Sequence, residues 1–541
     1  MSLVELVAKG EEDLFLTSKP QMTFFKAVYR RSTVFSFQQI PQTFLNTPDF
    51  GKKTPCIINR IGDLISDIVL VITVPSISRI YNADQTVDKY TRFAWIRKLG
   101  FGIIKNIDIK IGDKVIQQFT GEWINAWYEL NKEEKDFNKI IGNIPELFNY
   151  DYEKDEYTLY IPLPFWFSKS PSLVLPLCCL KNHNVEVLLE LEDLNKCYKL
   201  SPTHYILMND YVCQFEQDEY IVQTIDDTTI VGQFAFFDYT TRRMYYSQIT
   251  KELFKLADSD NDKYLIKGLK SNIKLMPLIK DNSTEQDHKY SIVYTHQAPS
   301  NIKVKDCYLL IDYVFIDDQE RERFYSHAHN YIIEQVNETI TQNISSTITS
   351  CSTGLKDPIT YLVWYCKQNI FDDMYNNDKF NFTNSYQYND ILYKHILQDD
   401  YVISNNNELN EDVLYYIGNN KRLNDKYNHK QTGNSLIKNC KILFNGNEVI
   451  NESYCFFHNI QSYNHFNCNN QTGLCVYSFA IEPLKLQPSG SCNMNKIDNV
   501  KMELTLDNCI NTNNTCTFKC YSVSYNWLRI KGGYGGLLFI N

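Results

Sequence analysis

Alternation of apolar and polar side chains is the commonest pattern along this chain, and it predicts β-strands. Residues 500–507 place Val, Met, Leu and Leu on one face and Lys, Glu, Thr and Asp on the other, and residues 185–192 set Val and Leu against Glu. Residues 68–74 are apolar on both faces, which predicts a central strand. Helical spacing is rarer, and residues 121–130 and 319–336 are the two segments that it predicts as short helices. The pattern therefore predicts an all-β fold of the sandwich class with a few short helices.

One hairpin pattern occurs twice. Residues 105–116 comprise an alternating strand, a Gly-Asp turn and a new strand, and residues 438–450 repeat this design around an Asn-Gly turn. An aromatic segment follows each hairpin, at residues 123–128 and 454–457. Asn-Gly hairpins are common enough to recur by chance, but the shared surroundings favour a duplicated β-domain.

Composition is consistent with large packed cores. Of the 541 residues, 43% are hydrophobic and 14% aromatic, and the 38 Tyr and 31 Phe favour strands. The net charge of −10 argues against a protein that coats nucleic acid, although the same charge is ordinary for a soluble protein. The sequence contains no run of 18 apolar residues and no basic-then-apolar signal sequence, so we expect a cytosolic chain whose 16 Cys are mostly buried, reduced thiols.

Five ordered landmarks resemble the major capsid proteins of large icosahedral DNA viruses of eukaryotes. They are residues 10–17 with 20–31, residues 161–167 with 175–177, residues 312–317 with 320–324 and 331–335, residues 476–499, and residues 525–530 with 532–536. The chain departs from the family pattern at Val34, Asn330 and Lys496, where the family often has Asn, Glu and Arg. These departures affect local contacts and not the resemblance as a whole.

The resemblance implies two tandem eight-stranded jelly rolls and a structural role. Three chains would form a homotrimer, and its six jelly rolls would make a pseudo-hexagonal capsomer that tiles an icosahedral shell. The implied partners are neighbouring capsomers, minor capsid and penton proteins and, indirectly, an internal membrane, with no direct contact to nucleic acid. The implied location is the virion capsid, assembled in the host cytoplasm.

The domain organisation expected from this resemblance has four parts. They are an N-terminal arm at residues 1–22, a first jelly roll at 23–318, a connecting helix at 319–336 and a second jelly roll at 337–541. Two jelly rolls need far fewer than 541 residues, so we expect the excess in polar, weakly periodic loops at about 195–305 and 366–434. Loops of this length are usually functional, and we expect these on the outer surface.

No catalytic, cofactor-binding or metal-binding residues are predicted. His327, His329 and Glu334 match the first metal motif of cupins, which are also jelly rolls. On a helix over 319–336 the two histidines would lie about 200° apart, which argues against a shared metal. The second cupin motif is missing, because no His follows the Pro-Ser-Gly of residues 488–490.

Two Asn-x-Ser/Thr sequons lie in or near the expected loops, at Asn282 and Asn381. They are candidate sites of virus-encoded glycosylation. We expect most of the remaining sequons to arise by chance, because the chain is rich in Asn.

The runner-up interpretation is a carbohydrate-binding β-sandwich of a spike or fibre protein, in which tyrosine-rich loops stack on glycans. A stable trimer that forms sheets or shells would favour the capsid interpretation, whereas a monomer retained on a glycan resin would favour the alternative. A cupin-like enzyme is a third interpretation, and the histidine geometry argues against it.

Overall fold

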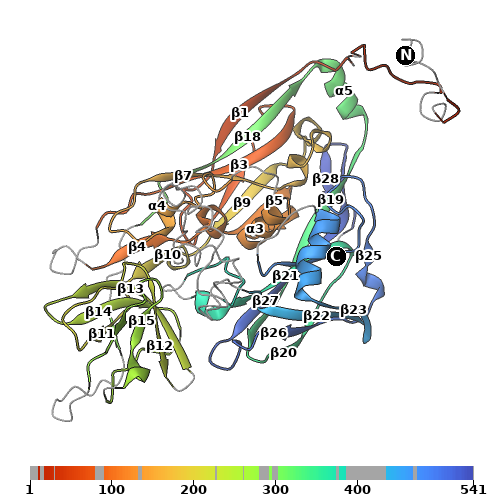
Figure 1. Cartoon of the computed structure of the whole chain (residues 1–541). Coiled ribbons are helices and arrows are strands. Elements are labelled where there is room, and N and C mark those ends of the chain that lie inside the picture. Colours follow the sequence, from red (N-terminus) through yellow and green to blue (C-terminus); the bar gives the residue numbers. More distant parts are fainter. Residues whose placement is uncertain are drawn as a thin grey trace, which may run out of the picture.

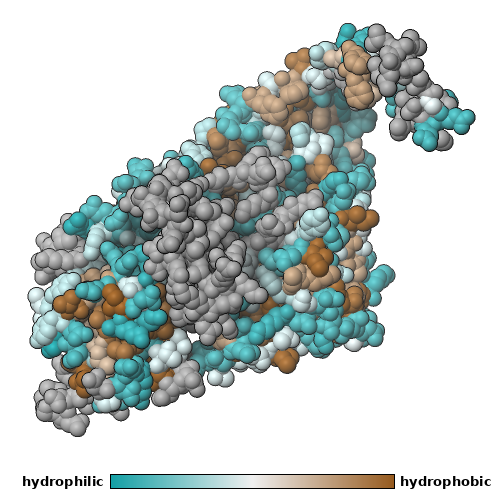
Figure 2. Space-filling view, in the orientation of Figure 1, coloured by the Kyte–Doolittle hydropathy of each residue, from teal (hydrophilic) through white to brown (hydrophobic). Residues whose placement is uncertain are grey.

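The computed structural model describes most of the chain. The described residues are 10–12, 18–27, 29, 31–79, 90–131, 137–225, 228–250, 252–259, 261–279, 291–294, 302–372, 377–384, 434–466 and 472–539. Figure 1 shows two β-sandwiches beside each other and a smaller β-domain at one end. The visible surface is largely hydrophilic, and apolar side chains gather near the end from which the N-terminal segment leaves (Figure 2). The all-β prediction is confirmed.

The first sandwich consists of two antiparallel sheets. One has the strand order β1 (Phe35–Thr43), β18 (Asp306–Ile316), β3 (Leu64–Val74) and β7 (Tyr157–Pro162), with β8 (Leu175–Pro176) beside β3. The other has the order β2 (Lys53–Ile57), β9 (Val185–Leu191), β5 (Ile104–Ile111) and β6 (Lys114–Phe119). The first strand therefore begins 12 residues after the expected domain start at residue 23.

The second sandwich has the same construction. One sheet has the order β19 (His329–Ile344), β27 (Cys516–Lys531), β21 (Pro358–Gln368) and β24 (Cys475–Ser478), with β25 (Cys492–Asn493) beside β21 and β28 (Tyr534–Leu537) beside β27. The other has the order β20 (Ile348–Thr353), β26 (Val500–Leu506), β22 (Ile437–Phe444) and β23 (Asn447–Ser453). Both sandwiches thus have the two four-stranded sheets of a jelly roll.

The two sandwiches correspond strand for strand, in chain order and in position within the sheet. The duplicated hairpins are β5–β6 and β22–β23, and left-handed backbone at Gly112 and at Asn445 and Gly446 forms their turns. A helical segment follows each hairpin: α3 (Gly121–Leu130) in the first sandwich and two π-helical turns over 456–466 in the second. The predicted duplication is confirmed.

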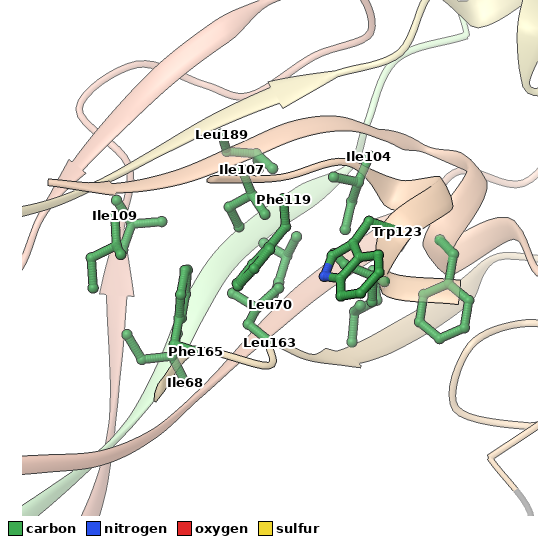
Figure 3. Close-up of a cluster of buried hydrophobic side chains, with 14 of the residues drawn as sticks. Ile68, Leu70, Ile104, Ile107, Ile109, Phe119, Trp123, Leu163, Phe165 and Leu189 are labelled. Carbon is green, nitrogen blue, oxygen red and sulfur yellow. The ribbon is translucent and has the colours of Figure 1, made fainter. Parts of the chain in front are cut away.

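Aliphatic and aromatic side chains fill the space between the sheets of the first sandwich (Figure 3). Ile68 and Leu70 of β3 lie opposite Ile107 and Ile109 of β5, and Trp123 of α3 packs beside them. Each of these side chains is at most 2% exposed, and burying one contributes roughly 1.5–3 kcal/mol. The central position predicted for residues 68–74 is confirmed, since β3 lies between β18 and β7.

Residues 195–305 do not form the loop that the sequence predicted. They contain a seven-stranded sheet of β16 (Lys274–Leu275), β15 (Ile266–Gly268), β12 (Tyr220–Ile225), β13 (Thr228–Asp238), β14 (Arg243–Gln248), β11 (His204–Leu207) and β17 (Ile292–Val293). This inserted sheet has its own core, which includes Ile221, Phe234 and Met244. The periodicity was weak because several strands have only two to four residues and a bulge interrupts β13.

The second expected loop, 366–434, is only partly described. Its first residues belong to β21, which continues to Gln368, and residues 377–384 lie against the first sandwich. Residues 385–433 lie outside the described part. The remaining named elements include β4 (Arg92–Trp95), paired with β10 (Tyr198–Ser201), and the short helices α2 (Leu99–Gly102), α4 (Pro145–Phe148) and α5 (Asp318–Ser326).

Gly121, the first residue of α3, is expected to tolerate no side chain. A Cβ there would lie 2.0 Å from the backbone oxygen of Phe101 and 2.5 Å from that of Ile104. We predict that Gly121→Ala lowers the free energy of unfolding by about 1–3 kcal/mol, as measured by denaturant titration. Gly354→Ala is the matched control, because no atom lies within 4 Å of its Cβ position. Equal losses in the two variants would contradict the close packing of α3.

Candidate functional site

The two sandwiches are connected through α5 and β19, in the segment predicted as a single helix over 319–336. The helix ends at Ser326, and β19 begins at His329, so the prediction is wrong for the second half. Asp317 caps the helix by accepting a hydrogen bond from the backbone N–H of Glu320 at 2.7 Å. Tyr331 and Ile333 lie two positions apart and are both buried, which is the periodicity of a strand. The helical interpretation overlooked this pattern.

Asp63 holds α5 on the first sandwich. Two guanidinium nitrogens of Arg321 donate to its carboxylate oxygens at 2.7 and 3.0 Å, and the backbone N–H of Ile316 donates at 3.1 Å. Partial burial raises the pKa of Asp63, but the hydrogen bonds from Arg321 and Ile316 and the charge of Arg321 outweigh it and keep this pKa below its usual value. This bidentate pair sets the direction in which the chain leaves the first sandwich.

The cupin-like residues do not converge on one point. His327 Nδ1 lies 3.0 Å from the backbone oxygen of Arg323, His329 Nε2 lies 2.8 Å from that of Phe324, and Glu334 pairs with Lys169 at 2.6 Å. The helical argument against a shared metal fails, because His329 is on a strand. Instead, each of the three side chains is held by a different hydrogen-bond or ion-pair partner. Among the described residues, no group of three or more His, Cys, Asp or Glu is placed to hold a metal ion.

A buried ionic network lies between the two sandwiches. Glu122 of α3 accepts hydrogen bonds from Lys519 of β27, from Tyr365 Oη at 2.9 Å and from Tyr521 Oη at 3.5 Å. Glu338 of β19 completes it, 3.4 Å from Lys519 and 2.9 Å from Tyr521 Oη. Burial raises the pKa of Glu122, but neighbouring ammonium groups, chiefly that of Lys519, outweigh it and hold this pKa well below its usual range.

Apolar packing and two glutamines extend this seam. The ring of Trp123 lies 5.4 Å from that of Tyr521, and buried side chains of both sandwiches form one continuous cluster. Gln117 of β6 donates to the backbone oxygen of Glu334 in β19 at 2.6 Å, and Gln335 returns a hydrogen bond to the backbone of β6 at 3.2 Å. Each of the two facing edge strands thus donates side-chain hydrogen bonds to backbone carbonyl groups of the other. These hydrogen bonds hold the two sandwiches in a fixed relative position.

Two arginines attach the inserted sheet and residues 377–384 to the rest of the chain. Arg92, which is 2% exposed, donates to both carboxylate oxygens of Asp218 at 2.7 and 3.0 Å. Arg97 forms an ion pair with Asp378. Without Asp218 the buried guanidinium of Arg92 would lose its counter-ion, so this contact gives the inserted sheet a defined position.

Exposed apolar side chains recur along the N-terminal segment and the first strand, interspersed with polar residues that include Lys26 and Arg31. We name these apolar side chains the arm surface; they are 51–99% exposed and comprise Met22, Phe24, Phe25, Tyr29, Val34, Phe35 and Phe37. The last two belong to β1, an edge strand that carries no charged residue. Natural edge strands are usually blunted by charge or covered, and clustered exposed apolar groups mark contact surfaces.

The structure bears on the sequons and thiols as well. Asn381 is completely buried, and its Oδ1 accepts hydrogen bonds from the backbone N–H and the hydroxyl of Thr383 at 3.1 and 2.8 Å. The folded chain therefore does not present Asn381 for glycosylation, which corrects that expectation; Asn282 lies outside the described residues.

The described cysteines are free thiols and most are buried, as expected. No helix in the described ranges is long and apolar enough to span a membrane.

Comparison with known proteins identifies the family. Residues 23–239 match the family described as major capsid protein N-terminus, and residues 320–536 match that of the large eukaryotic DNA virus major capsid protein. The chain belongs to the major capsid proteins of large eukaryotic DNA viruses. This capsid protein is 32% identical to the probable capsid protein 4 of Acanthamoeba polyphaga mimivirus, over 99% of this chain and 98% of the relative.

Solved capsid structures share the fold of this capsid protein. The Faustovirus major capsid protein has a TM-score of 0.58 at 10% identity and covers 97% of this chain and 94% of its own. The VP54 protein of PBCV-1 has a TM-score of 0.56 at 20% identity and covers 96% of this chain and 100% of its own. These structures show the double jelly-roll fold, and the family matches with the mimivirus relative show the structural capsid role.

Sequence reasoning missed the ionic network. In the sequence, Glu122 is one of two acidic residues in a largely apolar helix, and Lys519 is one polar position in an alternating strand. Nothing in a single sequence connects positions 122, 338 and 519. The landmarks, in contrast, lie mainly in the strands and turns that build the two sandwiches.

Removing the charge of Lys519 should weaken the seam through Glu122. Lys519→Met leaves the buried carboxylate without its nearest counter-ion, and we expect the free energy of unfolding at pH 7 to fall by about 3–5 kcal/mol. Lys519→Met combined with Glu122→Gln removes both charges and should recover much of this loss. Denaturant unfolding followed by tryptophan fluorescence measures both variants.

The pH dependence of these variants has a definite sign. In the unaltered protein the low pKa of Glu122 contributes stability above the carboxyl group's unfolded value of about 4.3, and this contribution is lost at lower pH. In Lys519→Met burial should raise that pKa, so the deficit is largest at pH 7 and shrinks toward pH 5. A deficit that does not change with pH, or a double variant no more stable than the single one, would speak against the network.

Proposed function

We propose that this chain is the subunit of a homotrimeric capsomer. The observation that carries the proposal is the strand-for-strand correspondence of two sandwiches within one chain. Three chains about a threefold axis would place six similar sandwiches in a ring, and this ring fills a sixfold lattice position. The seam around Glu122 keeps the two sandwiches of a chain at a fixed spacing, so that each chain acts as one rigid third of the tile.

The arm surface supports further contacts in this assembly. Its exposed aromatic side chains are suited to burial against minor capsid proteins beneath the tile, while the flanks of the sandwiches contact neighbouring capsomers. Penton proteins fill the fivefold positions, and the internal membrane is reached only indirectly. The proposal places the chain in the virion capsid, assembled in the host cytoplasm, without direct contact to nucleic acid, without a cofactor and without a catalytic step.

Light scattering on the purified protein tests the trimer. We expect three chain masses at micromolar concentration, because an interface that holds a capsid tile should bury more than about 2,000 Å² and be obligate. A stable monomer under these conditions would contradict the proposal of a homotrimer.

Polar substitutions in the arm surface test the attachment role. Phe24 and Phe25 are 89% and 99% exposed, so replacing both with Ser should leave the melting temperature within about 1 °C and the trimer mass unchanged. The variant trimers should nevertheless fail to be incorporated into shells that also contain the minor capsid proteins, as seen in electron micrographs. Val293→Ser, on the 57% exposed Val293 of the inserted sheet, is the control and should assemble normally. Normal assembly of the arm variant would exclude the arm surface as a contact site.

A further inference from the structure

The tip of the β13–β14 hairpin carries the exposed Tyr239 and the half-buried Arg242, and Tyr211 of the segment after β11 lies beside Arg242. We name Tyr211, Tyr239 and Arg242 the tip cluster. The tyrosines are 65% and 60% exposed, and the guanidinium carbon of Arg242 lies 4.8 Å from the ring centroid of Tyr211. Figure 1 shows β13 and β14 at the opposite end of the molecule from α5, so the tip cluster is remote from the arm surface.

The backbone beneath the tip cluster is firmly held. Asp238 accepts hydrogen bonds from the backbone N–H and hydroxyl of Thr240 at 2.9 and 2.6 Å and from the hydroxyl of Thr241 at 2.8 Å. These hydrogen bonds, first those of Thr240, lower the pKa of Asp238 to about 2, so its carboxylate stays charged and bonded. The backbone N–H of Met208 donates to the oxygen of Arg242 at 2.9 Å. The side chains are thus presented on a pre-organised turn.

Arg242 is an unexpected residue at its position. Its backbone φ is +55°, in the left-handed region that favours Gly or Asn. The conformation of the turn therefore does not explain why a long side chain stands at this position. Other arginines of this chain, such as the buried Arg92 and Arg321 of α5, form ion pairs with carboxylates. Within the described structure no ion pair involves Arg242, and its recorded side-chain contact is the face of Tyr211. A guanidinium that lies on a ring keeps its in-plane N–H groups available for an anion.

We propose that the tip cluster binds an acidic saccharide. The carboxylate of a sialic or uronic acid would pair with the guanidinium of Arg242, and the C–H face of the sugar ring would pack on the open face of a tyrosine. A protein partner fits less well, because a stable interface covers about 800 Å² on each side and the tip cluster offers only two rings and one cation. This inference goes beyond the capsomer role and does not depend on it.

Saturation-transfer NMR on the intact protein tests the proposal. The probes are sialyllactose and digalacturonic acid, each at about 10 mM to detect millimolar affinity, with lactose as the neutral counterpart. We expect transfer to at least one acidic probe and at least tenfold less to lactose. Arg242→Gln and Tyr211→Ala should each reduce the signal at least fivefold, whereas Arg323→Gln on α5 should leave it unchanged.

A second measurement separates binding from structure. Arg242→Gly relieves the left-handed backbone, so its melting temperature should equal or exceed that of the unaltered protein while binding is lost. A lower melting temperature would assign Arg242 a structural role and overturn the proposal. It would equally be overturned if neither acidic probe binds, if lactose binds as well as the acidic probes, or if Arg242→Gln binds normally.

Discussion

A carboxylate buried between two β-sandwiches is the constraint on which much of the architecture depends. Glu122 comes from the first sandwich and Lys519 from the second, and the buried carboxylate of Glu122 is tolerable in the interior only with a counter-ion. The network favours one relative position of the two sandwiches, because sliding them apart would leave the carboxylate unpaired. The continuous apolar cluster around Trp123 provides the bulk of the contact, and the charges provide its specificity.

The two sandwiches are similar in topology but differ where they have been extended. The inserted sheet lies between β9 and β18 of the first sandwich, whereas the equivalent connection in the second, between β26 and β27, is only residues 507–515. The insertion leaves the sheets of the first sandwich intact and adds a separate core, anchored through Arg92 and Asp218.

The sequence was informative where local periodicity and burial coincide. The alternation in 185–192 and 500–507, the helix at 121–130 and the paired hairpins were all predicted, because each is determined by neighbouring residues. Sequence patterns gave the wrong secondary structure where tertiary contacts determine it. The charge-rich start of 319–336 suggested a helix throughout, although pairing with β27 makes its second half a strand. The inserted sheet is hard to predict, since four of its strands have only two to four residues and a bulge interrupts β13.

The candidate sites show the same division. The capsid role followed from landmarks spread along the chain, whereas the ionic network depends on three positions that only the fold brings together. Electron microscopy of the purified protein tests the central claim most directly, that two rigidly joined sandwiches per chain build a pseudo-hexagonal tile. Class averages should show a threefold particle with six lobes at roughly equal spacing. Particles with two lobes, or lobes whose spacing varies from particle to particle, would contradict it.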